Sequence, residues 1–189
     1  MIKLYASNII KELSDEGLDL INENFDSTIL DRINQATNTN YKLKRFTTRL
    51  MLINIFKELN IDTMKLKAIY YNDQGKLIIP DEKINISISY CEDKAICLVS
   101  NSKIGVDIEN LNKKVSLKNR SLLETFTKTE IGSSLSFYKA WTKIESIIKI
   151  YKNVGIGKLF TNNNFFKSTY NTKYLLFENN FLIAISTKN

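Results

Sequence analysis

The 189-residue sequence contains no histidine. This absence excludes serine and cysteine nucleophiles that depend on an imidazole base, and it excludes the usual zinc sites. A general acid or base in this protein is therefore a carboxylate, a lysine or a solvent molecule. The search for a functional site starts from the acidic and basic side chains.

Cysteine and long apolar runs are also scarce. The two cysteines, Cys91 and Cys97, lack the spacing of a metal site, and we predict that both are reduced core residues. No apolar run reaches transmembrane length, and residues 1–5 alternate like a short strand, without the apolar segment of a signal peptide. We therefore expect a cytoplasmic protein with no membrane partner.

The remaining composition is that of a globular protein with anionic partners. A hydrophobic content of 43% in 189 residues is enough to build the core of one large domain or of two small half-domains. The net charge of +7 favours association with anions. Nucleic acid, a nucleotide-like cofactor, anionic lipid and an acidic protein all fit that charge.

Residues 104–109 have the alternation of a β-strand. Ile104, Val106 and Ile108 alternate with polar or small residues, so Asp107 and Glu109 are predicted to project from the same face. Same-face positions on a strand lie roughly 6.5 Å apart. Two carboxylates at that spacing suit Mg²⁺, which uses one or two protein carboxylates and leaves positions for phosphate oxygens.

Residues 133–152 contain no glycine or proline and have the apolar period of a helix. On that helix Trp141, Glu145 and Lys149 fall at i, i+4 and i+8, which places them in one stripe. A third carboxylate with a lysine one turn away suits a metal-bound diphosphate. Taken alone, Trp141 is better explained as a core residue than as a platform for a cofactor.

The N-terminal part is predicted to be largely helical. We expect a helix at residues 14–35 with a break near Asp26 and Ser27, a polar loop at 36–41, and a second helix at 44–59. Arg45 and Arg49 lie one turn apart on the second helix. A solvated helix face is the plain interpretation of these arginines.

Strands dominate the rest of the chain. We expect an antiparallel meander at 84–90, 95–100 and 103–109, a basic loop from Lys113 to Arg120, and a capping box from Thr127 to Glu130 before the helix. Further strands are expected at 157–160, 165–169, 174–177 and 181–186, with a hairpin turn at 178–180. Residues 94–100 weakly resemble 181–186, which hints at an internal repeat.

The two motifs together resemble a known family. A Gly-Val-Asp-Ile-Glu strand followed by a Trp-Thr-x-x-Glu-Ser-x-x-Lys helix, with Gly155 and Gly157 beyond it, is similar to the 4'-phosphopantetheinyl transferases of the larger, surfactin-type (pseudodimeric) branch. The resemblance implies an α+β fold with two similar half-domains. Each half would have an antiparallel sheet of three or more strands packed against a long helix, over residues 1–101 and 102–189.

The resemblance also implies roles for individual residues. Asp107, Glu109 and Glu145 match the family's magnesium ligands, and Lys149 matches a lysine that contacts the cofactor's phosphates. The implied coenzyme A contacts are basic or polar residues of the N-terminal half, namely Arg32, Arg45, Lys76 of a Gly-Lys element, Ser89 and Tyr90.

Three positions depart from the family pattern. Tyr90 stands for a histidine and donates a hydrogen bond without supplying positive charge. Ile144 stands for a lysine, with Lys143 adjacent but about 100° away on the helix, and Leu77 stands for a proline. These departures bear on cofactor affinity more than on chemistry.

The implied activity is Mg²⁺-dependent transfer of the 4'-phosphopantetheine arm of coenzyme A to a serine of an acyl or peptidyl carrier protein, with release of adenosine 3',5'-bisphosphate. The base that deprotonates the serine is Glu145, Glu130 or a metal-bound water. The basic loop would attract an acidic carrier, and the resemblance implies a monomer.

Two other functions stay open. The departures from the pattern are compatible with a module that binds coenzyme A or a carrier without turnover. A small basic nucleic-acid-binding protein is a further alternative, although the sequence lacks the aromatic strand signature of RNA-binding domains and any zinc-finger spacing.

Overall fold

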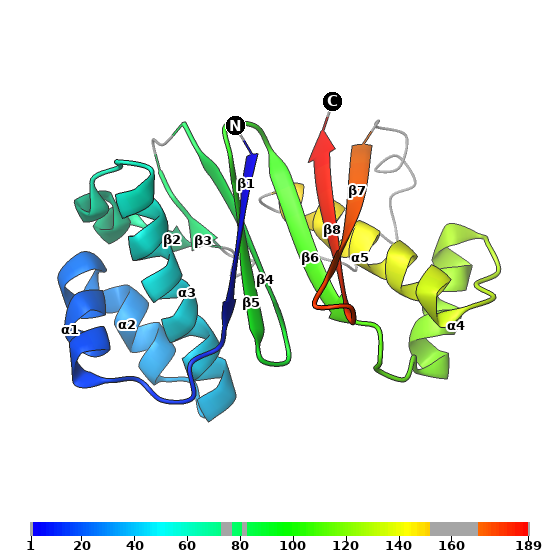
Figure 1. Ribbon diagram of the computed structural model, residues 1–189, viewed down its shortest axis with the longest axis horizontal. Coiled ribbons are helices and arrows are strands. Elements are labelled where there is room, and N and C mark those ends of the chain that lie inside the picture. Colours follow the sequence, from blue (N-terminus) through cyan, green and yellow to red (C-terminus); the bar gives the residue numbers. More distant parts are fainter. Residues whose placement is uncertain (1, 73–76, 81–82, 152–169, 189) are drawn as a thin grey trace.

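A computed structural model describes residues 2–72, 77–80, 83–151 and 170–188. The fold is α+β, as expected, with antiparallel sheets in the middle and helices on the outside (Figure 1). The elements in chain order are β1 (Ile2–Asn8), α1 (Asp15–Asn24), α2 (Ser27–Asn34), α3 (Thr39–Glu58), the 3-10 helix η1 (Thr63–Ala68), β2 (Tyr70–Tyr71), β3 (Leu77–Ile78), β4 (Asn85–Cys91), β5 (Lys94–Ser100), β6 (Ile104–Asn110), α4 (Leu117–Thr127), α5 (Ser134–Ile150), β7 (Tyr170–Phe177) and β8 (Phe181–Lys188).

Two three-stranded antiparallel sheets share one strand arrangement. Their strand orders are β1-β5-β4 and β6-β8-β7. In each sheet the central strand is the second arm of a hairpin, β4-β5 or β7-β8, and it also pairs with a strand that comes before the hairpin in the chain. The weakly similar segments 94–100 and 181–186 lie in these central strands. The division into half-domains at 101/102 stays a prediction.

The expected meander from β4 to β6 is wrong at its third strand. Strand β6 follows β5 after a short connection, yet it pairs with β8. The reason is that β1 and β4 occupy both edges of β5, which leaves β5 no free backbone groups for a further partner.

Alternation along β5 divides the core into layers. Ala95, Cys97 and Val99 pack with the N-terminal helices, whereas Ile96 and Leu98 pack with β6 and β8 between the two sheets. Helices α1 to α3 cover the outer side of the first sheet, and α4 and α5 cover the second (Figure 1). The prediction for the cysteines is confirmed, since Cys91 and Cys97 are free and buried, and burial raises the pKa of the Cys97 thiol to about 12.

Capping side chains set the boundaries of the N-terminal helices. The predicted break is confirmed, because Asp26 caps α2 by accepting a hydrogen bond from the Thr28 amide at 2.9 Å. The predicted loop at 36–41 is too long. Asn38 accepts from the Tyr41 amide at 3.1 Å and starts α3 five residues earlier than expected.

Two boundaries before the motif helix also differ from expectation. Ser116 caps α4, so Lys118 and Arg120 lie on a helix and not in a loop. Thr127 is the last residue of α4, and Ser133 caps α5, so the predicted capping box from Thr127 to Glu130 is wrong. In both places a serine hydroxyl accepts the hydrogen bond that caps the helix, from the Asn119 amide for α4 and from the Ser136 amide for α5.

The final hairpin is confirmed, and its turn meets the other sheet. Glu178 and Asn179 have positive φ, of 47° and 62°, in the turn between β7 and β8. The strands predicted at 157–160 and 165–169 lie outside the described residues. No helix in the described part of the chain is long and apolar enough to cross a membrane.

Lys94 joins the two hairpin turns. Its ammonium contacts Asn8 Oδ1 at 2.6 Å and Glu178 Oε2 at 2.8 Å, and its side chain is 10% exposed. The hydrogen bond that Lys94 donates to Glu178 raises the pKa of Lys94. A raised lysine pKa stabilises the fold below the ordinary value of 10.5, and this contribution disappears as the pH rises through the folded-state pKa.

We expect Lys94→Met to lower the thermal midpoint of unfolding by several degrees at neutral pH, because Asn8 and Glu178 lose a shared donor. Lys3→Met is the matched control, since it removes a lysine–glutamate pair whose side chains are 42% and 54% exposed. Thermal denaturation followed by circular dichroism checks both variants. Equal midpoints for Lys94→Met and Lys3→Met would contradict the expected role of Lys94.

Candidate functional site

The alternation predicted for β6 places its two carboxylates toward α5. Ile104, Val106 and Ile108 are buried in the core between the sheets. Asp107 and Glu109 therefore lie on the opposite face, which α5 covers. The pattern of residues 104–109 thus predicted correctly which face carries the acids.

Gly105 lets α5 approach β6 very closely. A Cβ atom at this position would lie 1.7 Å from the Ser146 carbonyl oxygen and 3.2 Å from the Ile150 amide nitrogen. Ser146 is fully buried, and its hydroxyl also lies 2.7 Å from Ser186 Oγ on β8. This contact holds the helix that carries Glu145 and Lys149 against the strand that carries Asp107.

Strands β4 and β6 lie side by side (Figure 1). They belong to different sheets, and side-chain hydrogen bonds join them in place of backbone pairing between the described strands. Ser87 Oγ accepts a hydrogen bond from the Val106 amide at 3.0 Å. Two residues along, the Ser89 hydroxyl donates to Asp107 Oδ1 at 2.7 Å. Serines at alternate positions of β4 therefore bring that strand to the acidic face of β6.

Lys149 completes a three-residue contact at this junction. Its ammonium donates to Asp107 Oδ1 and to Ser89 Oγ, each at 2.8 Å. The Asp107 side chain is 8% exposed, and that of Lys149 is 24% exposed. Ser89, Asp107 and Lys149, predicted from segments far apart in the sequence, are thus in mutual contact.

Glu109 and Glu145 lie near this contact and share its electrostatic field. Burial, followed by the charge of Asp107, raises the pKa of Glu109 to about 7. Burial, again followed by Asp107, raises the pKa of Glu145, although Lys149 opposes this shift. The charge of Asp107 thus disfavours the ionised form of both glutamates, and a cation beside them would relieve this repulsion.

The fit of this group to a metal ion rests on Asp107. Its Oδ2 atom is buried without a hydrogen-bond partner among the described residues, so one hard oxygen donor is available. The three carboxylates do not lie close enough together to form a ready-made metal site. Residues 2–72, 77–80, 83–151 and 170–188 contain no other group of three or more Asp, Glu, Cys or His side chains that could hold a metal ion. The Lys149 ammonium already contacts Oδ1.

Glu130 lies apart from the other predicted site residues. It is exposed and precedes Ser133, the N-cap of α5. Glu145 comes eleven residues after Ser134, which is about 16 Å along a helix axis. The structure therefore does not bring Glu130 together with Asp107 and Lys149.

Two further motif residues of α5, Trp141 and Ile144, pack in the hydrophobic core. Trp141 stacks on Phe137 with ring centroids 5.8 Å apart and packs against the core, as its plain interpretation suggested. Ile144 is 4% exposed in the same core. The position where the family pattern has a lysine thus faces the protein interior here.

A cluster of three arginines lies on the other side of β4. The solvated-face interpretation is wrong for Arg45 and Arg49, which are 8% and 2% exposed. Arg32, Arg45 and Arg49 all place their guanidinium groups near the ring of Tyr71. We call these four residues the arginine cluster. The spacing of Arg45 and Arg49 was visible in the sequence, whereas no sequence signal pointed to Tyr71.

Tyr90 faces the arginine cluster and not the Ser89 contact. Its hydroxyl lies 3.1 Å from Thr48 Oγ1 on α3. Burial is the main cause that raises its pKa, so the phenol is neutral at neutral pH. Lys76, also predicted to bind the cofactor, lies outside the described residues.

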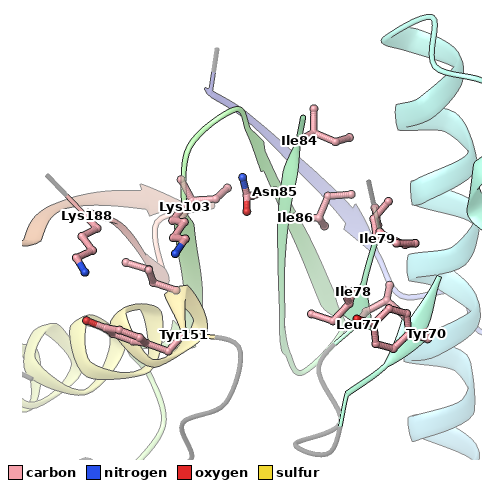
Figure 2. A pocket seen from close by; sticks show the side chains of 13 residues that line it. Tyr70, Leu77, Ile78, Ile79, Ile84, Asn85, Ile86, Lys103, Tyr151 and Lys188 are labelled. Carbon is pink, nitrogen blue, oxygen red and sulfur yellow. The ribbon is translucent and has the colours of Figure 1, made fainter. Parts of the chain in front are cut away.

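A pocket of about 530 Å³ opens near the C-terminal end of α5. Figure 2 shows Lys103, Tyr151 and Lys188 on one side of it and aliphatic side chains on the other. Ile150, adjacent to Lys149, also lines the pocket. The aliphatic side is formed by residues of β3, β4 and the segment between them, including Leu77, Ile78, Ile79, Ile84 and Ile86.

Comparison with curated proteins finds a distant similarity. The chain is 27% identical over 119 residues to the 4'-phosphopantetheinyl transferase gsp of Aneurinibacillus migulanus, an alignment that covers 58% of this chain and 47% of the relative. The chain thus spans about half the length of the curated relative that it matches. No protein-family model matches the chain. The similarity supports a relationship to the 4'-phosphopantetheinyl transferase superfamily.

Proposed function

We propose that this protein is a 4'-phosphopantetheinyl transferase of the surfactin-type branch. It transfers the phosphopantetheine arm of coenzyme A to a serine of an acyl or peptidyl carrier protein and releases adenosine 3',5'-bisphosphate. The observation that carries this proposal is the contact of Ser89, Asp107 and Lys149 beside Glu109 and Glu145. It combines acids for a cation, a lysine for a phosphate and a candidate base.

Lys149 and Glu145 have the central roles in this mechanism. The Lys149 ammonium binds the phosphate that the carrier serine attacks and stabilises the charge that develops on it. Glu145 lies one turn earlier on α5 and accepts the proton of the serine hydroxyl. Burial and the charge of Asp107 raise its pKa above the ordinary value, which makes the carboxylate a stronger base. A water molecule is the other candidate for the base, whereas Glu130 is exposed and lies apart from Asp107 and Lys149.

Asp107, Glu109 and Glu145 are the proposed ligands of Mg²⁺. The unpartnered Oδ2 atom of Asp107 and the repulsion that Asp107 exerts on Glu109 and Glu145 support this assignment. When bound, the ion neutralises charge on the diphosphate of coenzyme A. The chain itself contributes oxygen donors and keeps them partly shielded from water.

The coenzyme A molecule is proposed to extend along β4. Arg32, Arg45, Lys76 and Tyr90 bind its nucleotide end, and Ser89 contacts the diphosphate. The pocket beside Ile150 receives the pantetheine arm, since Ile150 directly follows Lys149 on α5. The aliphatic side of the pocket suits the methyl and methylene groups of that arm.

An acidic carrier protein is the proposed second substrate. Lys113, Lys114 and Lys118 are exposed near the start of α4, on the same side of the molecule as α5. A basic surface attracts the acidic helices of such carriers and raises the association rate. We propose that the protein acts as a monomer in the cytoplasm.

We expect incubation with coenzyme A, Mg²⁺ and an apo carrier protein to add one phosphopantetheine arm to the carrier, as measured by intact-protein mass spectrometry. EDTA is expected to abolish the mass gain, and Glu145→Gln to lower its rate by about 100-fold, because proton acceptance is lost. No gain on several carriers, with coenzyme A binding retained in calorimetry, would support the alternative of a binding module without turnover.

A further inference from the structure

Three hydroxyl groups join α5 to both strands of the final hairpin. Ser186 Oγ on β8 lies 2.7 Å from Ser146 Oγ on α5 and 2.8 Å from Thr172 Oγ1 on β7. Ser146 Oγ in turn donates to the carbonyl oxygen of Lys143 at 2.9 Å. Ser146 and Ser186 are fully buried, so bulk water does not compete for these hydrogen bonds. We call Thr172, Ser186 and Ser146 the hydroxyl chain.

Strand register places the hydroxyl chain beneath α5. Ser186 pairs directly with Gly105 on one side and with Thr172 on the other. Directly opposed residues share one face of a sheet, so these three form a row across β6, β8 and β7 on the face that α5 covers. Gly105 leaves room for the helix backbone at Ser146, and the next two positions of the row supply hydroxyls. The row thus fixes one residue of α5 against all three strands.

A count of protons gives the hydroxyl chain one direction. Each serine or threonine hydroxyl has a single proton to donate. Because Ser146 donates to the Lys143 carbonyl oxygen, Ser186 must donate to Ser146, and Thr172 must donate to Ser186. Removal of one hydroxyl therefore leaves a buried neighbour without one of its partners, which weakens the attachment of α5 to the sheet.

Ser146 lies between the two proposed functional residues of α5. Glu145 directly precedes it, and Lys149 follows three residues later, on a neighbouring part of the helix surface about 4.5 Å along the axis. The Lys149 ammonium donates to Asp107 Oδ1 and to Ser89 Oγ, each at 2.8 Å. A shift or rotation of α5 at Ser146 would therefore move the ammonium away from Asp107.

We propose that Ser186 and Thr172 are positioning residues that act through Ser146 to hold Glu145 and Lys149 in place for the transfer reaction. This inference rests on the proposed function, in which Lys149 binds the reacting phosphate and Glu145 accepts the serine proton. A misplacement of about 1 Å can reduce the rate of a reaction by roughly 100-fold. Hydrogen bonds between helix and sheet restrain movements of that size.

Steady-state kinetics of carrier modification test this role. Ser186→Ala is expected to lower kcat about tenfold and to change KM for coenzyme A by less than about twofold, because the misplaced groups act mainly in the transition state. Thr172→Val keeps the shape of the side chain but removes its hydroxyl, and we expect kcat to fall about threefold. Thr172→Ser retains the hydroxyl and is expected to keep the parent kcat, although it loses a methyl group.

Thr187→Val is the matched control on the same hairpin. Thr187 follows Ser186 on β8, so its side chain lies on the opposite face, and its hydroxyl donates to the Asn171 carbonyl oxygen at 3.4 Å. This variant also loses a hydroxyl, but kcat is expected to equal that of the parent protein. Equal kcat values for Ser186→Ala and Thr187→Val would overturn the inference. So would a Thr172→Ser variant as slow as Thr172→Val, because loss of packing would then explain both.

A second measurement keeps this inference separate from the proposed function. Reductive methylation with formaldehyde and borohydride, followed by peptide mass spectrometry, reports how freely the Lys149 ammonium reacts relative to the exposed Lys143 on the same helix. We expect Lys149 to react about twofold faster in Ser186→Ala than in the parent protein, and at the parent rate in Thr187→Val.

The two measurements together decide between the possible failures. If the parent protein modifies carriers and Ser186→Ala does so equally fast, the transferase function stands and the positioning role does not. If the parent protein modifies no carrier, the methylation rates still decide whether the hydroxyl chain positions Lys149. A faster reaction in Ser186→Ala supports that role, and equal rates in the parent protein and Ser186→Ala overturn it.

Discussion

Replacing Gly105 by alanine is expected to lower the free energy of unfolding by about 3 kcal/mol, the upper part of the range for an overpacked core. The added methyl group would lie 1.7 Å from the Ser146 carbonyl oxygen, which belongs to the backbone of α5 and has no rotamer to change. The helix itself must therefore move away from β6. Urea denaturation followed by circular dichroism measures the change.

Gly132→Ala is the matched control for this substitution. No described atom lies within 4 Å of a Cβ placed there, so the free energy of unfolding should change by less than about 0.5 kcal/mol. If Gly105→Ala proved as stable as Gly132→Ala, the close packing of α5 on β6 would be disproved. A destabilised Gly105→Ala that still folds should also transfer more slowly, since Glu145 and Lys149 move with the helix.

Lys149→Met is expected to reduce carrier modification by about 100-fold, the usual cost of removing one charged donor from a reacting oxygen. The substitution preserves an unbranched side chain but removes the ammonium that contacts Ser89 Oγ and Asp107 Oδ1. Intact-protein mass spectrometry measures the initial rate, and calorimetry measures coenzyme A affinity. A larger loss in rate than in affinity would indicate that Lys149 stabilises the transition state.

Lys143→Met provides the corresponding control on the same helix. Lys143 is exposed and lies six residues before Lys149, and among the described residues its side chain makes no ion pair. The two variants have the same change in net charge, so general electrostatic effects on carrier association affect both alike. Similar rates for the two variants would refute a specific role for Lys149.

The sequence predicted one side of the candidate site in detail. Alternation over residues 104–109 predicted the face that carries Asp107 and Glu109, and helical spacing placed Glu145 and Lys149 in one stripe. Both inferences succeed because they depend on local geometry, with a period of two in a strand and 3.6 in a helix. The contact between Lys149 and Asp107 then follows from the packing of one element on the other.

The arginine cluster shows where local patterns fail. Spacing along α3 relates Arg45 to Arg49, but a helical period alone does not distinguish a solvated face from one buried beneath β2. Tyr71 comes from a two-residue strand that has no periodicity to detect. The burial of Arg49 at 2% exposure depends on α2, α3 and β2 meeting in space.

The amino-acid sequence by itself determined most local elements and the chemical character of this protein: a strand with one acidic face, an amphipathic motif helix, and a candidate site without histidine. Tertiary structure decided the pairing of β6 with β8, the contact of Ser89 with Asp107, and the convergence of three arginines on Tyr71. These contacts join residues distant in the chain. They depend on which strand edges are already paired and how closely helices approach, which no local pattern specifies.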